Sequence, residues 1–387
     1  MLSKKIRNIL LYLLNIPLYW VSKLLPKNEN IWVFGAWFGN KYADNSKYLF
    51  EYINEFQPQI RAIWLTNSDE VVDKLKLKDY EVYKRYSLKA INVGLRAKYS
   101  IFVHSNAADG MMFLNNNAKL IQLWHGIPLK KIGNDDLLIF NPKFSSNIKQ
   151  VLFPFANEYY DCIISSSEED KSKFTTAFNS KNIVIAGYPR NDVLFTCKYS
   201  DNPNVTITYL PTFRDNLGDQ IDLFTDFGFI AEKWNTTLKR LNIILNIKMH
   251  PVNKPKDDLL KEYIKYECIN FLNEVDVAEL LPDTDILITD YSSVYFDFLL
   301  TNKPIIFAPF DFDKYIKKDR ELYYDYNEVT PGPKCKNWDE VLEWVVMFKE
   351  KQEIFKNERE VVKNRFHKFQ DGGSCERVYN EIIKLSN

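Results

Sequence analysis

The chain has 387 residues, 46% of them apolar, and its 51 Lys and Arg are balanced by 51 Asp and Glu. That length suits two domains of a soluble globular protein, and the zero net charge gives no support for a nucleic-acid partner. The five cysteines are scattered without a CxxC pair, so neither a zinc ribbon nor a disulfide framework is indicated, and a reducing cytoplasmic setting fits best.

Residues 1–27 are basic and amphipathic. Five cations and no acid flank the apolar run 9–21, which Asn15 and Pro17 interrupt. The order resembles a signal peptide, but no small-x-small cleavage site follows, and the run is short for a membrane span. We expect the segment to lie in the membrane interface, drawn to anionic lipid. A helix packed on the protein's own core and a true span remain alternatives.

Strand and helix patterns alternate through the first half of the chain. Runs of β-branched and aromatic residues predict strands, and apolar residues at helical spacing predict helices. The predicted strands are 30–39 with its turn, 61–66, 81–85, 99–105, 118–126, 160–167 and 182–189, and the predicted helices are 44–56, 68–76 and 88–97. Asp44, Asn45 and Ser46 are capping candidates for the helix at 44–56.

Strand and helix patterns also alternate in the second half of the chain. Strands are predicted at 204–214 with its turn, 242–251, 285–293 with its turn and 304–310, and helices at 227–241, 276–284 and 294–303, with a long helical stretch at 338–366. Alternation of this kind indicates a parallel sheet with crossovers in each half.

The two halves meet near residues 190–205, where the polar run 198–204 breaks the pattern. The sequence therefore predicts an α/β fold with two Rossmann-type, doubly wound domains, at 28–198 and 199–387. Ligands of open parallel sheets bind outside the carboxyl ends of the strands. With two such domains, we expect the site in a cleft between them.

Four predicted strand ends carry polar or ionisable side chains. These residues are His125, Thr212 and Arg214, Lys248 and His250, and Asp290 with Ser292 and Ser293. The last group lies in a DYSS turn before a helix, where serines cap the helix and its first amides attract anions such as phosphates. A plain serine N-cap is the simpler interpretation of that turn.

His125 lies between Trp124 and Gly126, after an apolar run. A lone histidine is more often structural, but Gly126 allows a sharp turn or a close approach, and an imidazole can take a proton from a hydroxyl near neutral pH. His250 has the same placement in the other half. One histidine from each domain suits a transfer reaction, in which His125 activates the acceptor and His250 contacts donor phosphate.

Other motifs narrow the chemistry. No GxxxxGK[ST] loop is present, and no GxGxxG follows the first strand, which disfavours ATP hydrolysis and dinucleotide oxidoreduction. No cluster with metal-ligand spacing such as HExxH occurs, so no metal site and no cofactor are predicted, although metal dependence stays open. Arg214, Lys248 and Arg377 are candidates to neutralise phosphate, each with a surface ion pair as the simpler interpretation.

The motifs, taken together, resemble the CDP-glycerol:glycerophosphotransferases, the teichoic-acid primase and polymerase family. The resembling stretches span roughly 30–380 and include LWHGIPLKKIG, GYPRNDVLF, YLPTFRD, KMHP, TDYSSVYFDFLL and DGGSCER. The pairing of WHG-x-P-x-K with TDYSS is the specific part. Many family members carry a further N-terminal domain for which no counterpart is seen here.

The resemblance implies a GT-B-like fold with an acceptor domain at 28–198 and a CDP-donor domain at 199–387. It also implies peripheral attachment to the cytoplasmic membrane face. The expected reaction moves glycerol phosphate, or ribitol phosphate, from CDP-glycerol or CDP-ribitol to a hydroxyl of a lipid-linked saccharide or polyol-phosphate chain, in teichoic acid or capsule-type polymer synthesis, and releases CMP.

The resemblance also implies residue roles. His125 matches the family's proposed base, and His250 matches its second essential histidine, near the donor pyrophosphate. Donor-binding positions are Thr212, Arg214, Lys248, Asp290, Ser292, Ser293 and Arg377, and acceptor-side positions are Asn45, Lys47, Gly126 and Lys130. Two alternatives stay open from the residues alone: a GT-B glycosyltransferase or epimerase that uses a nucleotide-diphosphate sugar, and a noncatalytic membrane-associated scaffold.

Overall fold

The computed structural model describes residues 4–136, 159–196, 204–212, 214, 222–249, 257–272, 275–318, 321–351 and 354–385. These residues divide into two compact units. Unit 1 holds 4–125, 159–192 and 371–385, and unit 2 holds 126–136 and the described residues of 193–370. Three segments are grouped differently from the expected domain ranges: 126–136 and 193–196 group with unit 2, and the C-terminal 371–385 group with unit 1.

Unit 1 is built on a parallel sheet of seven strands. In chain order they are β1 (Asn28–Phe34), β2 (Arg61–Thr66), β3 (Val82–Lys84), β4 (Ala97–Phe102), β5 (Lys119–Gln122), β6 (Cys162–Ser165) and β7 (Ile183–Ile185). The spatial order is β3-β2-β1-β4-β5-β6-β7. Each predicted strand of this half has a counterpart, so the doubly wound arrangement expected for it is confirmed.

The helices of unit 1 are α1 (Lys4–Leu24), α2 (Asp44–Phe56), α3 (Asp69–Lys76), α4 (Leu88–Gly94), α5 (Asn106–Asp109), α7 (Glu168–Ala177) and α17 (Ser374–Lys384). Serine caps start four of them: the side chains of Ser68, Ser87, Ser105 and Ser167 accept hydrogen bonds from backbone amides of α3, α4, α5 and α7. The sequence patterns had not predicted α7 or α17.

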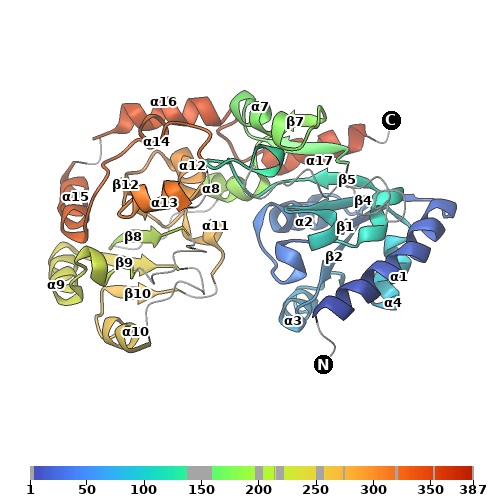
Figure 1. Cartoon of the computed structure of the whole chain (residues 1–387), viewed down its shortest axis with the longest axis horizontal. Coiled ribbons are helices and arrows are strands. Elements are labelled where there is room, and N and C mark those ends of the chain that lie inside the picture. Colours follow the sequence, from blue (N-terminus) through green and yellow to red (C-terminus); the bar gives the residue numbers. More distant parts are fainter. Residues whose placement is uncertain are drawn as a thin grey trace. The chain divides into compact units, whose positions relative to one another are not determined.

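Helix α1 packs on unit 1 beside α4 (Figure 1). Its residues Leu18 and Tyr19 contact a core cluster that includes Ala90 and Val93 of α4. Two polar side chains, Asn15 and Ser22, face the protein and are buried. Asn15 accepts a hydrogen bond from the amide of Phe113 at 3.0 Å and donates to the Tyr86 hydroxyl at 3.3 Å. The alternative of a helix packed on its own protein therefore describes one face of α1.

Unit 2 has a parallel sheet of five strands: β8 (Val205–Leu210), β9 (Ile243–Ile247), β10 (Ile269–Phe271), β11 (Ile286–Thr289) and β12 (Ile305–Phe307). Their spatial order is β10-β9-β8-β11-β12, and β8, β9 and β10 lie side by side in Figure 1. Its core gathers around Trp338, whose ring packs edge-on against Tyr209, Phe229 and Trp234.

The helices of unit 2 are α8 (Val193–Thr196), α9 (Ala231–Leu241), α10 (Asp257–Tyr263), α11 (Val277–Leu280), α12 (Val294–Phe298), α13 (Phe312–Lys318), α14 (Tyr326–Val329), α15 (Trp338–Glu350) and α16 (Lys356–Phe366). The stretch expected to be helical over 338–366 is thus two helices. Lys351, with φ of -136° and ψ of 74°, leaves the helical conformation after α15, and Phe355, with φ of 62°, is the left-handed residue that precedes α16.

Each sheet has a point where the strand order reverses. In unit 1 it lies between β1 and β4, and in unit 2 between β8 and β11. Crevices at such points, outside the carboxyl ends of the strands, are where doubly wound folds bind ligands. The loops that follow these strands are therefore where functional side chains are expected in each unit.

Candidate functional site

His125 follows β5 in unit 1, next to the point where the strand order reverses. Its turn is tight, because Trp124 has φ of 57° and Gly126 has φ of 125°. The second value is one that side-chain-bearing residues rarely adopt, which explains the glycine. The Nδ1 atom of His125 lies 3.2 Å from the carbonyl oxygen of Val103. A carbonyl only accepts, so Nδ1 carries the proton in the neutral ring and Nε2 keeps its lone pair.

The first residues of α2 hold this turn in place. The side-chain amide of Asn45 donates to the carbonyls of Leu123 and Trp124, at 3.3 and 2.8 Å. Its oxygen accepts from the amide of Arg190 at 3.1 Å, and the Arg190 guanidinium donates to Asp44 at 2.9 Å. Asn45 therefore joins α2, the His125 turn and the segment after β7 into one assembly.

Lys47, predicted on the acceptor side, is buried in the first turn of α2. Its ammonium group lies 4.7 Å from the ring centre of Tyr48 and 5.9 Å from that of Tyr42. Aromatic faces stabilise a cation in this position.

A second histidine, His104, stacks on His125. The ring centres are 4.8 Å apart and the planes differ by 20°. His104 follows β4, and its Nδ1 lies 3.3 Å from a carboxylate oxygen of Asp109, which is fully buried in α5. We call His104, Asp109 and His125 the histidine cluster.

The backbone around the cluster is unusual. Four non-glycine residues near it have positive φ: Trp37, Phe38, Asp44 and Trp124, with values of 49°, 59°, 65° and 57°. Each such residue costs free energy, on the order of 1–3 kcal/mol, that the surrounding packing must offset. Left-handed residues gather at sites where a side chain has to be held in one direction, and here the rings of Trp37 and Phe38 pack against His104.

The environment lowers the pKa of His125 to about 4 from its ordinary value of 6.5. The main cause is burial, which disfavours the charged ring, and the charge of His104 acts in the same direction. Arg190 also lowers this pKa, whereas Asp44 and the Val103 carbonyl raise it. The ring of His125 is therefore neutral at neutral pH and can accept a proton.

In unit 2 the predicted phosphate ligand Arg214 is bonded to protein acceptors. Its guanidinium donates to Asp290 at 2.7 Å, to both carboxylate oxygens of Asp311 at 2.9 Å, and to the Thr212 carbonyl at 2.6 Å. The side chain is 4% exposed. One cation thus meets two buried carboxylates, and the predicted contact between Arg214 and phosphate remains a prediction.

Asp290 organises the reversal point between β8 and β11. Its carboxylate accepts from the amides of Thr212 at 2.8 Å and of Tyr291 at 2.6 Å, besides the bond from Arg214. This geometry agrees with an orienting role for an acid that would repel phosphate. The hydroxyl of Thr212 is enclosed and has no hydrogen-bond partner among the described residues.

The serines of the DYSS turn differ from the expected caps. The Ser292 hydroxyl accepts from the amide of Val294 at 3.4 Å, while Ser293 makes no side-chain cap. Helix α12, which they precede, has five residues. The turn is thus capped weakly by Ser292, and the predicted donor contacts of both serines are still predictions.

Two further predicted residues lie in unit 2. Lys248 directly follows β9, where its backbone amide donates to the Tyr209 carbonyl at 3.0 Å. The ammonium group of Lys130 donates to the Tyr315 hydroxyl and lies 4.8 Å from the centre of that ring. His250 lies outside the described residues, so its expected position opposite His125 stays a prediction.

Arg377 was grouped with the donor domain but lies on α17, in unit 1. Its guanidinium donates to the Ala186 carbonyl at 2.9 Å and to Asp371 at 2.7 and 3.1 Å. Asp192 caps the same helix by accepting from the amides of Ser374 and Cys375. The DGGSCER motif therefore attaches the C-terminal helix to the segment after β7, a long-range pairing that local sequence patterns do not indicate.

Sequence reasoning missed His104, Asp109, Asp44 and Arg190. The signal for His104 was present, because it follows a predicted strand just as His125 does. Asp44 and Arg190 pair with each other over a long sequence separation, whereas Asp109 lies five residues after His104 on α5, a helix that the sequence patterns did not predict. Within the described ranges, no group of three or more His, Cys, Asp or Glu side chains is arranged to hold a metal ion.

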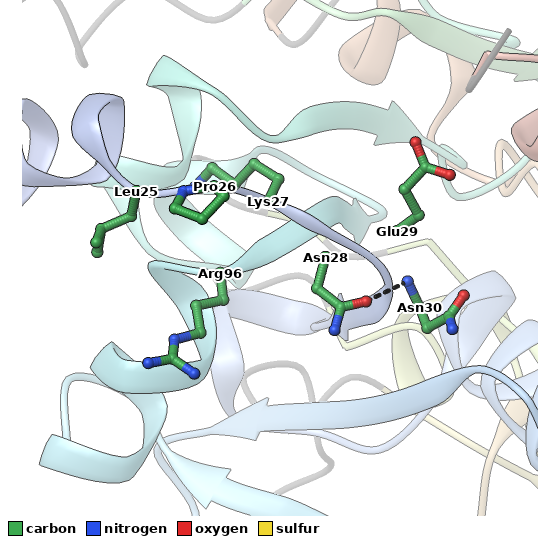
Figure 2. A pocket seen from close by; sticks show the side chains of 7 residues that line it. All are labelled: Leu25, Pro26, Lys27, Asn28, Glu29, Asn30 and Arg96. Atoms are coloured by element: carbon green, nitrogen blue, oxygen red, sulfur yellow. Dashed lines mark hydrogen bonds between the residues drawn. The ribbon is translucent and has the colours of Figure 1, made fainter.

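A surface hollow in unit 1 lies away from these residues. Figure 2 shows its lining, which runs from Leu25 to Asn30 and includes Arg96. It forms where the chain passes from α1 into the amino end of β1, whereas the histidine cluster follows the carboxyl ends of β4 and β5. Burial lowers the pKa of Lys27 in this hollow to about 8, and its ammonium group donates to the Leu95 carbonyl.

Comparison with known proteins identifies the family to which the sequence is similar. A sequence model of the family described as CDP-Glycerol:Poly(glycerophosphate) glycerophosphotransferase matches residues 18–384. A teichoic acid poly(glycerol phosphate) polymerase of Bacillus spizizenii is 28% identical over 407 residues, covering 98% of each chain. A teichoic acid glycerol-phosphate transferase of Staphylococcus aureus is 29% identical over 406 residues, covering 98% of this chain and all of that protein.

Among solved structures, the wall teichoic acid polymerase TagF has a TM-score of 0.74 at 23% identity. The alignment covers 100% of this chain and 98% of that one. At this identity the likeness establishes the fold alone.

Proposed function

The chain belongs to the CDP-glycerol:poly(glycerophosphate) glycerophosphotransferase family and is a transferase, and we propose that it extends a teichoic-acid-type polymer at the membrane. The donor is CDP-glycerol, with CDP-ribitol as the other polyol to be tested. The acceptor is a hydroxyl of a lipid-linked saccharide or of a growing polyol-phosphate chain.

The proposed step is a displacement at phosphorus. The acceptor oxygen forms a bond to the β-phosphorus of the CDP-polyol, the bond from that phosphorus to the bridging oxygen breaks, and CMP leaves. The acceptor proton goes to Nε2 of His125. The observation that carries this role is the hydrogen bond between Nδ1 of His125 and Val103 at 3.2 Å, which leaves Nε2 as the basic atom of a neutral ring.

The donor is proposed to bind at the reversal point of unit 2. Candidate contacts are His250, Lys248 and the backbone amides after Asp290, since transfer of a phosphoryl group depends on positioning and on neutralising charge. The enclosed hydroxyl of Thr212, which has no partner in the described structure, is a further candidate donor to a phosphate oxygen.

A donor panel tests the reaction class. Purified protein is incubated with a lipid-linked disaccharide analogue and with CDP-glycerol, CDP-ribitol or a UDP-sugar, and the released nucleotide is measured. We expect CMP from a CDP-polyol and no UDP. Release of UDP with transfer of the sugar, and no release of CMP, would contradict the proposed donor.

The membrane part of the proposal rests on the outer face of α1. Its exposed apolar side chains are Leu10, Leu13, Leu14, Trp20, Val21 and Leu24, with exposed fractions from 39% to 83%. They recur at the spacing of one helical face, while Asn15 and Ser22 face inward. No helix in the described part of the chain is long and apolar enough to cross a membrane.

Such a helix suits the interface of a bilayer, with its axis in the membrane plane. Lys23 lies 5.6 Å from the ring centre of Trp20, which puts a cation beside an aromatic residue where headgroups meet acyl chains. We propose that α1 attaches the enzyme to the cytoplasmic face of the membrane, within reach of a lipid-linked acceptor.

Sedimentation with vesicles tests this attachment. Wild-type protein should bind vesicles that contain anionic lipid, and Trp20→Glu with Leu13→Glu should reduce binding about tenfold or more, since burying each apolar side chain contributes about 1.5–3 kcal/mol. Leu77→Glu is the matched control, because Leu77 is 88% exposed and directly follows α3, outside α1. Equal binding by the double variant would contradict the proposal, and dimerisation through this face would replace it.

A further inference from the structure

The stacked rings of the histidine cluster follow from the register of two neighbouring strands. Strand β4 pairs with β5 in parallel, and Phe102 is opposite Gln122. His104 comes two residues after Phe102, and His125 three after Gln122, so both emerge at the same edge. The Gln122 side chain ties the two turns together, because it donates to the His104 carbonyl at 2.6 Å and accepts from the Trp124 amide at 2.9 Å.

Asp109 holds His104 from the other side. Besides its contact with the ring, its carboxylate accepts from the amides of Phe38 at 2.7 Å, Val103 at 3.1 Å and His104 at 2.8 Å. The rings of Trp37 and Phe38 lie 5.0 and 4.7 Å from that of His104, measured between centres. His104 is thus held by a carboxylate and two aromatic rings, and the ring of His125 stacks on it. We call these contacts the clamp of His104.

The charges of the cluster are coupled. Burial alone would raise the pKa of Asp109, but hydrogen bonds from the His104 ring and from backbone amides hold it below its ordinary value. The carboxylate of Asp109 lies 3.3 Å from Nδ1 of His104. A positive ring stacked at 4.8 Å opposes a second positive charge on His125. The other charged groups facing His125 are Asp44 and Arg190, which act in opposite directions.

We infer that His104, backed by Asp109, is a positioning residue that sets the ring plane of His125 and keeps that ring neutral until it accepts the acceptor proton. This inference rests on the proposed function of His125 as the base. After transfer, the repulsion from His104 helps His125 release the proton to solvent, which restores the base for the next turnover. His104 does not contact the reacting atoms in this account.

The test uses the small number of histidines in the chain, which is four. The full-length protein is labelled with 15N-histidine, and the titration of His125 is followed by NMR in wild type and in His104→Phe, which retains an aromatic ring but no charge. We expect the pKa of His125 to rise by about one unit, the size expected for a neighbouring charge. The acid limb of the pH profile of kcat/KM should move to higher pH by the same amount. Asp109→Asn should shift both in the same direction.

Lys41→Gln is the matched control. Lys41 lies 5.0 Å from the ring centre of Trp37. The substitution therefore removes a cation beside one ring of the clamp and leaves the contacts of His125 in place. Its effect on the His125 titration should be small. His104→Ala, which also removes the stacking, should lower kcat with little change in KM, and His104→Gln should not restore it.

The outcomes separate the two claims. A His125 titration that moves in both His104→Phe and Asp109→Asn supports the coupling, and if the kinetic limb stays in place, the assignment of His125 as base fails instead. A His125 titration unchanged in both variants, with both folded by circular dichroism, overturns the inference.

Discussion

At the scale of single residues, Asn45 does the most to place the candidate base. Its one side chain bonds the carbonyls of Leu123 and Trp124 and the amide of Arg190, so three segments of unit 1 meet at it. One of these bonds is buried and the other two are partly buried, where a polar group left without a partner costs more than it would at the surface. Asn45 therefore fixes the His125 turn, and its place on the acceptor side stays a prediction.

Replacing Asn45 by Ala should lower both activity and stability. We expect kcat to fall about 10- to 100-fold because the His125 turn loses its orientation. The free energy of unfolding should fall by about 1–3 kcal/mol because two carbonyls lose their donor. Asn54→Ala is the control, since Asn54 lies on the same helix and donates within it to Phe50. If Asn54→Ala and Asn45→Ala behaved alike in CMP release, the positioning role would be wrong.

At the scale of elements, the reversal point of each sheet explains where the chemistry gathers. In unit 1 the loops after β1, β4 and β5 bring Trp37, His104 and His125 together, and in unit 2 the loops after β8, β11 and β12 bring Arg214, Asp290 and Asp311 together. Carboxyl ends of adjacent parallel strands share one edge, so residues far apart in sequence become neighbours. The positive charge of Arg214 offsets the repulsion between the buried carboxylates of Asp290 and Asp311.

Arg214→Met should destabilise unit 2. Removing one partner of a buried ion pair leaves uncompensated charge and costs about 3–5 kcal/mol. Urea unfolding followed by tryptophan fluorescence measures this loss, because Trp234 and Trp338 are in the core of unit 2. Lys233→Met is the control, since Lys233 forms an exposed pair with Asp339. If the variant were as stable as wild type but no longer bound CDP-glycerol, Arg214 would instead be a residue that binds the donor substrate.

Most of the fold could be predicted from the sequence because its strands are buried apolar runs with helices between them. Residues that directly follow strands, such as His125 and Asp290, could be predicted for the same reason. The interactions of Arg377 and Asp192 could not, since they depend on α17 returning to unit 1 over a sequence distance that no local pattern encodes. The ion pairs of Arg214 with Asp290 and Asp311 could not be predicted either, because Asp311 lies in a loop without a recognisable motif.

At the scale of the whole molecule, two histidines with lowered pKa values link stability to pH. The pKa of His125 is lowered to about 4 from 6.5, and burial also lowers the pKa of His367, whose Nε2 lies 2.7 Å from the Phe296 carbonyl. As pH falls through 6.5 the unfolded chain takes up protons that the folded protein does not. Stability is therefore present above that pH and is lost as pH falls toward 4.

The expected loss from His125 alone is on the order of 3 kcal/mol over that interval, of which about 2 kcal/mol falls between pH 7 and pH 5. Thermal unfolding at pH 7 and pH 5 measures it. The wild type should lose more in Tm than His125→Gln, which has no group to titrate, and the comparison cancels the contribution of carboxylates. Identical losses in the two proteins would show that His125 titrates normally in the fold.

The central claim is that this chain transfers a polyol phosphate from a CDP donor with His125 as the base, and single-turnover release of CMP from CDP-glycerol tests it most directly. With acceptor present, wild-type protein should release CMP, and His125→Ala should lose at least about 100-fold in rate, the lower part of the range for general-base catalysis. Donor binding measured by calorimetry should remain. Wild-type rates of CMP release by His125→Ala would contradict the account.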